Sequence, residues 1–287
     1  MSAEVKTAKQ LLYVADPTSL PSYYGKIDVF ALHGLHYKLV GQIADYDNPQ
    51  GMTTDAAGNL YVTDIGVATE GAAVGDIKVF PKGAKYYSRI IVPADWVPFD
   101  IAVGRDGTLY VANIAPVGYF NPGSVSVYPP LASQPSRVLQ FNNFQVLGVT
   151  LHRRSNTIYV SYDGTGGTGG SIDEFVHARG KPKNLGVSYG APWSVREDGA
   201  DNLLACSGEG TINVYAESSG QLVQQISVPN GAMFEAFSKS RSKLFVSDFS
   251  KIEIYSYPAG KLIGNIDQSG WAGSNYPTGV AYWPPPQ

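Results

Sequence analysis

One five-residue pattern occurs six times along this chain of 287 residues. The copies are LYVAD from Leu12, LYVTD from Leu60, LYVAN from Leu109, IYVSY from Ile158, LLACS from Leu203 and LFVSD from Leu244. They follow one another at intervals of 48, 49, 49, 45 and 41 residues. A nearly constant period of this length is typical of repeat architectures, in which each unit buries its apolar face against the next unit.

Each copy is accompanied by further segments that read as strands. Apolar and polar residues alternate in the segment that follows, as expected for a strand packed on one face. These following segments are KIDVF, DIKVF, SVSVY, SIDEF, TINVY and KIEIY. The segments that precede the copies are PQGMTTD, PFDIAVG, VLGVTLH, PWSVRED, MFEAFSK and PTGVAYW. A weaker fourth segment, such as KLVGQI or SRVLQF, follows in most copies. Four strands per period predict an all-β, six-bladed β-propeller with four antiparallel strands in each blade.

The order of the segments predicts how the ring closes. The chain begins on the second strand of a blade and ends, at residues 277–283, on a first strand. We expect this last strand to pair with residues 11–15, which removes the exposed edges of an open array. Residues 1–10 are then an N-terminal extension, and residues 11–287 form a single propeller domain. A glycine in three of the six first strands predicts close approach of backbones around a narrow channel.

Composition and charge restrict the class of partner. A net charge of −3 with only 16% charged residues excludes the basic field of a nucleic-acid binder. No apolar run reaches membrane-spanning length, and the single Cys206 excludes an intrachain disulfide. The beginning of the chain, MSAEVKTAKQ, lacks the apolar stretch of a signal peptide. Low charge with abundant Tyr and Gly nevertheless favours an extracytoplasmic protein, periplasmic or secreted, without its export signal. We expect a monomer.

The pattern PxGΦAΦD, turn, LYVAD, turn, IxVF runs from Leu11 to Trp283 and resembles bacterial six-bladed propellers of the NHL-repeat and gluconolactonase-like kind, a superfamily that includes strictosidine-synthase-like proteins. The resemblance implies the fold, but such propellers include hydrolases, lyases and binding proteins.

In the gluconolactonase and paraoxonase families, Glu, Asn and Asp just before the first-strand glycine hold a divalent cation. The matching residues here are Gln50, Phe99, Leu147, Trp193, Phe234 and Thr278. None is a carboxylate, so we predict no inherited metal site, and a divalent cation in the channel remains only an alternative.

Two carboxylates stand out one residue further along. Three copies carry glycine there, whereas the third copy has Asp100, the fifth has Ser194 and the sixth has Glu235, where the alignment is ambiguous by one residue. Blades three and six are opposite in a six-membered ring. Asp100 and Glu235 could therefore face one another and share a proton, a cation or a basic ligand. The simpler interpretation, which we favour, is that both accept hydrogen bonds from strand-end N–H groups or channel waters.

Aromatic residues indicate two places for a ligand. Phe99, Trp193 and Phe234, with Gln50 and Leu147, either line a small-molecule pocket at the channel mouth or plug the channel with their rings. Long loops after the LYV strands share one edge of the ring. They carry Tyr23, Tyr24, Tyr119 and Phe120, which predict a surface for carbohydrate or protein contact.

Glu174 and the Asp or Asn residues that end the LYV-type strands have structural explanations. Glu174 stands where the other third strands carry Val or Ile, and we expect an ion pair with Arg196 or His152. Asp or Asn ends four of the LYV-type strands, at Asp16, Asp64, Asn113 and Asp248, as turn hydrogen bonding would require.

No GxSxG elbow is present and no catalytic triad can be named. We therefore favour a non-catalytic binding or scaffold propeller that recognises a protein, carbohydrate or small molecule through its long loops. The alternative is a small-molecule hydrolase, lactonase or lyase that acts at the channel mouth through Asp100 and Glu235. The sequence leaves open whether the protein is an enzyme.

Overall fold

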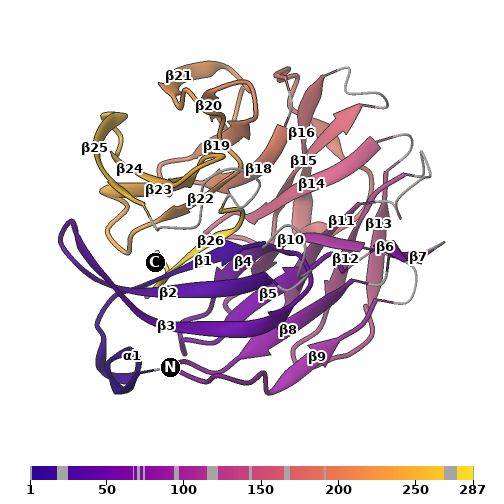
Figure 1. Ribbon diagram of the computed structural model, residues 1–287. Coiled ribbons are helices and arrows are strands. Elements are labelled where there is room, and N and C mark those ends of the chain that lie inside the picture. The colour runs from indigo at the N-terminus through magenta and orange to yellow at the C-terminus, as the bar shows by residue number, and fades with distance from the viewer. Residues whose placement is uncertain are drawn as a thin grey trace.

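The protein is a six-bladed β-propeller, as Figure 1 shows for the computed structural model. Each of its six main sheets has four antiparallel strands, which confirms the predicted fold. The structure describes residues 2–17, 25–66, 68–69, 72–73, 75–93, 97–114, 122–141, 144–164, 169–190, 192–267 and 277–286. No helix in these ranges is both long enough and apolar enough to cross a membrane.

The strands of each blade are numbered here from the channel outward. Blade one contains β26 (Val280–Trp283), β1 (Leu11–Asp16), β2 (Gly25–His33) and β3 (His36–Tyr46). Blade two contains β4 (Pro49–Thr54), β5 (Leu60–Asp64), β8 (Asp76–Phe80) and β9 (Arg89–Ile91). Blade three contains β10 (Val97–Val103), β11 (Leu109–Ile114), β12 (Ser124–Tyr128) and β13 (Arg137–Gln140).

The second half of the ring repeats this arrangement. Blade four contains β14 (Phe144–Leu151), β15 (Ile158–Gly164), β16 (Gly170–Phe175) and β17 (Lys183–Asn184). Blade five contains β18 (Pro192–Glu197), β19 (Asn202–Ser207), β20 (Thr211–Ala216) and β21 (Leu222–Ser227). Blade six contains β22 (Phe234–Phe237), β23 (Lys243–Ser247), β24 (Ile252–Ser256) and β25 (Lys261–Ile266). The remaining elements are α1 (Ala3–Thr7), the ribbon of β6 (Ala68–Thr69) and β7 (Ala72–Ala73), and a 3₁₀ turn at Val176–Ala178.

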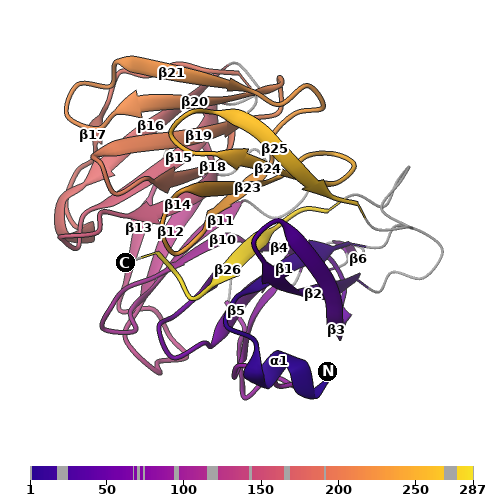
Figure 2. The same cartoon turned by 90° about the vertical axis from the view of Figure 1, so that its left-hand side faces the viewer.

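The two ends of the chain close the ring inside blade one. The C-terminal strand β26 pairs antiparallel with β1, from Leu11 opposite Trp283 to Val14 opposite Val280. Both views show the yellow C-terminal strand beside the indigo N-terminal strand (Figures 1 and 2). The predicted closure is therefore confirmed, and it gives every inner strand a hydrogen-bonded neighbour within its blade.

The hydrophobic core lies between blades. The described residues form six buried apolar clusters. Five of them join the facing surfaces of two neighbouring blades, and the cluster of blades one and six also includes Phe99 of blade three. Between blades one and two, for example, Tyr13 and Val29 pack with Met52, Val62 and Phe80. The alternation of apolar and polar residues along the strands produces this division, because successive side chains point to opposite faces of a sheet.

The recurrent glycines Gly51, Gly148 and Gly279 allow the blades to approach one another at the channel. A Cβ atom on Gly51 would lie 2.5 Å from the Cα of Asp100, and one on Gly148 would lie 2.8 Å from the backbone nitrogen of Val195. A Cβ atom on Gly279 would overlap the carbonyl oxygen of Gln50. These contacts confirm the close backbone approach predicted from the sequence.

The N-terminal extension packs on the propeller. Its short helix α1 places Val5 in the core cluster of blades one and two, where Val5 is fully buried. The Ser2 N–H donates to the carbonyl oxygen of Val40 at 3.0 Å, and Lys38 forms an ion pair with Glu4 at 2.6 Å. Residues 2–10 therefore cover the outer part of blade one, although the sequence pattern showed no strand there.

The recurrent aspartates at the ends of the second strands hold turns and neighbouring strands. Asp64 accepts hydrogen bonds from the Asn48 N–H at 2.7 Å and from Lys78 Nζ at 2.9 Å. Asp248 accepts from the Ser250 N–H at 2.6 Å. Their structural role, which the sequence indicated, is confirmed.

Candidate functional site

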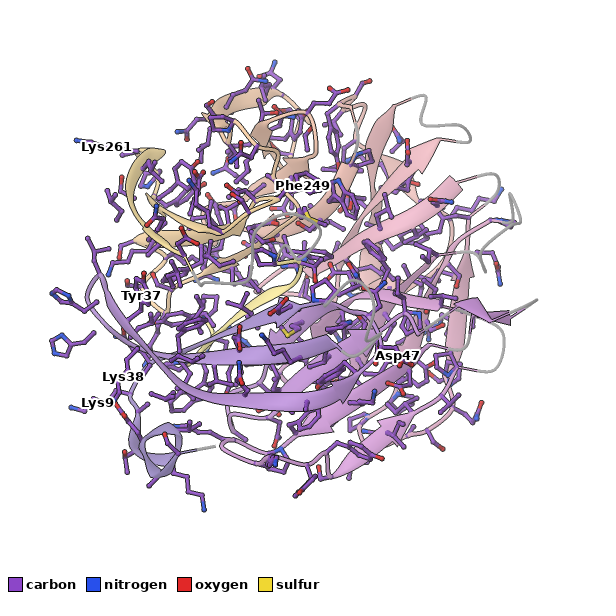
Figure 3. All side chains as sticks on the ribbon, in the orientation of Figure 1. Lys9, Tyr37, Lys38, Asp47, Phe249 and Lys261 are labelled. Carbon is purple, nitrogen blue, oxygen red and sulfur yellow. The ribbon has the colours of Figure 1, made fainter. Side chains whose placement is uncertain are left out.

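Aromatic rings close one end of the central channel. Phe99 of blade three lies 5.8 Å from Trp193 and 5.7 Å from Phe234 of the opposite blade, measured between ring centroids. Trp193 contacts Phe249 at 6.4 Å, and Figure 3 shows Phe249 over the inner part of the ring. Leu147 packs against the same cluster. Of the two interpretations offered by the sequence, the structure shows the plug.

This packing corrects the expectation that these residues form a ligand pocket. Phe234 has no exposed surface and Phe99 is 5% exposed, so a ligand cannot reach either ring without displacing the plug. The Gln50 side chain is buried, and its amide donates to Asn48 Oδ1 at 2.6 Å. Trp193 is half-buried, and its contact with a ligand stays a prediction. The loop aromatics Tyr23, Tyr24, Tyr119 and Phe120 lie outside the described residues.

A cavity occupies the other end of the channel. Its walls include the six inner-strand residues that pair with the second residue of each LYV-type strand. Five of these six residues are small and the sixth is an arginine: Thr53, Ala102, Thr150, Arg196, Ala236 and Ala281. Because small side chains do not fill the ring, a space of about 470 Å³ remains. That volume is within the range of small-molecule sites.

The single arginine of this ring is bound to a carboxylate from another blade. Arg196 Nη1 and Nη2 donate to the two carboxylate oxygens of Asp100 at 2.7 and 2.9 Å. Asp100 is fully buried and also accepts from the Val149 N–H at 3.1 Å. Burial lowers the pKa of Arg196, but the adjacent Asp100 outweighs this effect and holds the pKa above its ordinary value. Blades three, four and five are thus joined at the channel by one charged pair.

Glu235 occupies a different position from the one the sequence alignment predicted. It pairs with Val246, the third residue of its LYV-type strand, whereas Asp100 pairs with Ala112, the fourth residue. Four inner strands, β4, β10, β14 and β18, have a register shift near this point, and β22 has none. Without the extra residue of a bulge, Phe234 takes the position of Asp100 and Glu235 lies one place further along.

The Glu235 carboxyl group is buried, and its two hydrogen-bond donors are uncharged. One of its oxygens, Oε2, accepts hydrogen bonds from Ser194 Oγ and, at 2.9 Å, from Cys206 Sγ. The other oxygen, Oε1, is buried and has no hydrogen-bond partner among the described residues. Burial raises the pKa of Glu235, although the Arg196 charge and both hydrogen bonds oppose the shift.

These contacts correct the hypothesis that Asp100 and Glu235 share a proton, cation or ligand across the channel. Both carboxylates are bound to blade five instead, Asp100 through Arg196 and Glu235 through Ser194 and Cys206. The basic group near both of them is the protein's own guanidinium, whose positive charge disfavours a divalent cation at the same place. The interpretation that both carboxylates accept structural hydrogen bonds fits this geometry.

The raised pKa of Glu235 predicts a pH-dependent contribution to stability. The folded protein binds this proton more tightly than the unfolded chain does, so the contribution is present below the ordinary pKa of 4.5 and is lost as the pH rises through the folded value. Glu235→Gln cannot ionise and should gain stability relative to the wild type as the pH rises. Urea unfolding from about pH 4 to about pH 9 measures the difference. Glu209→Gln, at an exposed position, is the control, and a difference that does not change with pH would contradict the assignment.

The mouth of the cavity is basic. Arg105, Arg153, Arg154 and Arg241 line it, and they come from the turns that follow three of the first strands. Glu197 lies between two of them, 3.9 Å from both Arg153 Nε and Arg241 Nη2. Sequence reasoning missed this group because the three turns are far apart along the chain. The recurrence of arginine in the turns GRDG, HRRS and KSRS was the available signal.

A second cluster of polar side chains is structural. His152, Asp201 and Glu217 bring their ligand-type atoms within 4.8 Å of one another. His152 Nδ1 accepts a hydrogen bond from the Arg154 N–H at 3.1 Å, so the neutral ring carries its proton on Nε2, which lies 3.7 Å from Glu217. A metal ion would need Nε2 without that proton. We assign the cluster to a His–Glu contact between blades four and five.

Glu174 forms an ion pair, as predicted, but its partner is not one of the two residues expected from the sequence. Glu174 contacts Lys183 at 3.4 Å on the next strand of its own blade. Neither of the expected partners is bound to it in the structure, since Arg196 pairs with Asp100 and His152 lies near Glu217.

Comparison with known proteins identifies the fold. No protein-family model matches the sequence. No curated protein matches it either. Among solved structures, one from a nidogen/laminin complex superposes with a TM-score of 0.73 at 12% identity, over 95% of this chain and 98% of the other. The WD40 β-propeller domain of Doa1 superposes with a TM-score of 0.60 at 11% identity, over 89% of this chain and 83% of the other. At such low identities, the likeness establishes the propeller architecture alone.

Proposed function

We propose that this protein is a non-catalytic binding propeller that takes a small ligand into the cavity between its inner strands. The observation that carries the proposal is the ring of five small residues and Arg196, which leaves this end of the channel open while aromatic rings fill the other end. The charged groups beneath the cavity are engaged with one another. Asp100 is held by Arg196 on both of its oxygens, so it is a poor general base.

One observation favours an enzyme as the second candidate. Glu235 is a buried carboxyl group with a raised pKa, it borders the cavity, and its Oε1 atom has no hydrogen-bond partner among the described residues. A carboxyl group of this kind can act as a general acid. The lactonase, hydrolase or lyase hypothesis therefore depends on Glu235, without Asp100 as its partner.

Recognition of a protein or carbohydrate through the long loops is a further part of the proposal that rests on the sequence. The fold supports it in general terms, since one similar propeller was solved as part of a nidogen/laminin complex. The extracytoplasmic location and the membership of the NHL-repeat and gluconolactonase-like superfamily are likewise proposals from the sequence pattern.

Filling the cavity tests the proposal. Ala236→Trp should abolish ligand-induced stabilisation, because the indole ring takes the space between the small residues, whereas Ala236→Ser should preserve it. Thermal shift with a metabolite library that contains glucose, glucono-δ-lactone, citrate and calcium chloride makes the measurement, and circular dichroism verifies the fold of both variants.

Three results would contradict it. A compound that stabilises the wild type and Ala236→Trp equally binds elsewhere, and a library without any stabilising compound leaves the cavity without a function. Turnover of the lactone that is lost in Glu235→Gln would favour the enzyme.

A further inference from the structure

The arginines of this protein are concentrated at one cavity. The chain has eight arginines, and five of them line the channel cavity: Arg105, Arg153, Arg154, Arg196 and Arg241. None of the 13 lysines is among the lining residues, although the net charge of the chain is −3. A guanidinium group presents several donors in a fixed plane and remains charged when it is partly buried, which suits it to bind carboxylate and phosphate groups.

The carboxylates of the cavity do not balance this charge. Three carboxylates line it among the residues that the structure describes, namely Asp106, Glu197 and Glu235. Asp106 accepts from the Thr108 N–H at 3.0 Å and from Thr108 Oγ1 at 2.9 Å, so it closes its own turn. Burial of Glu235 favours its neutral form. The charge of Arg196 is neutralised by its ion pair with Asp100. Within the lining, the other four arginines have Glu197 and the exposed Asp106 as counter-charges, and outside it the charge of Asp198 also acts on Arg241.

Arg153 and Arg241 share Glu197 as a counter-charge. Each lies 3.9 Å from a different oxygen of Glu197, which is longer than a hydrogen bond. The Glu197 side chain is only 3% exposed, and neither its Oε1 nor Arg153 Nε has a hydrogen-bond partner among the described residues. Burial lowers the pKa of Arg241, Glu197 opposes the shift, and the nearby Arg153 charge adds to it. Buried polar atoms of this kind are normally satisfied in a folded protein.

We propose that the cavity binds a small organic oxyanion that carries at least two negative groups, with Arg153 and Arg241 as the residues that hold one of them. The inference rests on the proposed function, because it names the class of ligand for the same cavity. Glu197 is one counter-charge for two guanidinium groups. An oxyanion bound between these groups supplies a second counter-charge. The concave shape and the volume of about 470 Å³ favour a metabolite over an acidic polypeptide or nucleic acid.

The remaining arginines have separate roles. Arg105 and Arg154 are exposed at the mouth, where they attract anions and contribute a second point of contact. Arg196 is a positioning residue, since Asp100 already takes two of its donors and the Val195 carbonyl takes another hydrogen bond at 2.8 Å. Its guanidinium closes the floor of the cavity.

Calorimetric titration of the full chain at low salt tests the inference with citrate and fructose 1,6-bisphosphate as probes and sorbitol as the neutral compound. We expect the wild type to bind at least one of the two anions and not sorbitol. Arg153→Gln with Arg241→Gln should weaken that binding by about 10-fold or more, as expected for lost charge-assisted hydrogen bonds. Arg179→Gln removes the same charge from an exposed position outside the cavity and should change the affinity by less than about two-fold.

A second variant keeps the inference testable if the first variant misfolds. Arg105→Gln with Arg154→Gln alters exposed side chains only, so its fold should persist. It should weaken anion binding and make the affinity less dependent on salt, because fewer cationic groups attract the ligand.

Separate results overturn the inference and the proposed function. Equal anion affinity in the wild type and in both arginine variants would overturn the inference, as would failure of both anions to bind. If anions fail but a neutral compound binds in a manner that Ala236→Trp abolishes, the inference fails and the proposed function stands. If Ala236→Trp changes the binding of no compound, both the inference and the proposed function fail.

Discussion

Asp100→Ala should lower the free energy of unfolding by about 3–5 kcal/mol, the loss expected when one partner of a buried ion pair is removed. Asp100 has no exposed surface, and its two oxygens take two donors of Arg196, which is itself only 16% exposed. The substitution leaves a guanidinium group near the channel floor without its counter-charge. It also removes the acceptor of the Val149 N–H. Urea unfolding at neutral pH measures the loss.

A double substitution separates the charge from the packing. Arg196→Met in the Asp100→Ala background removes the uncompensated charge and should restore a large part of the lost stability, because an apolar replacement of a buried ion pair is often neutral. A loss below about 1 kcal/mol in Asp100→Ala, the usual value for exposed pairs, would show that water reaches the pair and would contradict the assigned burial.

Gly279→Ala should destabilise the protein by about 3 kcal/mol or more, at the upper end of the cost of overpacking. The added Cβ atom would overlap the carbonyl oxygen of Gln50 on β4, so the clash is with backbone and no side chain can turn away from it. Blades one and two would have to separate at the point where the ring closes. Thermal and urea unfolding of the purified variant report the effect.

Gly264→Ala is the matched control for this substitution. Its added Cβ atom would make only ordinary contacts, the nearest at 3.8 Å from Ile254, on the outer strand β25. We expect a change within about 0.5 kcal/mol, as for most surface substitutions. Equal effects of the two substitutions would show that close approach at the channel is not what requires glycine in the inner strands.

The fold was predictable because its information is local and repeated. Six copies of an alternating pattern specify strands, and their order specifies closure between residues 11–15 and the last strand. The elements that were missed are short ones with little periodic signal. Helix α1 has five residues, and β17 has two. Their positions depend on packing against neighbouring strands, which a pattern of that length cannot specify.

The candidate site was only partly predictable. Asp100 does stand at the position of the recurrent glycine, but in blade six Phe234 takes that position and Glu235 lies one place further along. The partners of the two carboxylates were not predicted. Arg196 reaches Asp100 from a strand 96 residues away along the chain. The absence of a bulge in β22 moves Glu235 by one position, which changes the neighbours that its side chain meets. Neither effect has a signature in the sequence of a single strand.

The sequence by itself determined the number of blades, the strand order, the closure of the ring and the positions at which glycine is required. These follow from the period of the repeat and from the alternation of side chains, which act over a few residues. The tertiary structure decided that Phe99, Trp193 and Phe234 plug one end of the channel, and that five arginines meet at the other end. Those outcomes depend on which side chains from different blades converge on one axis, and that convergence exists only once the ring has formed.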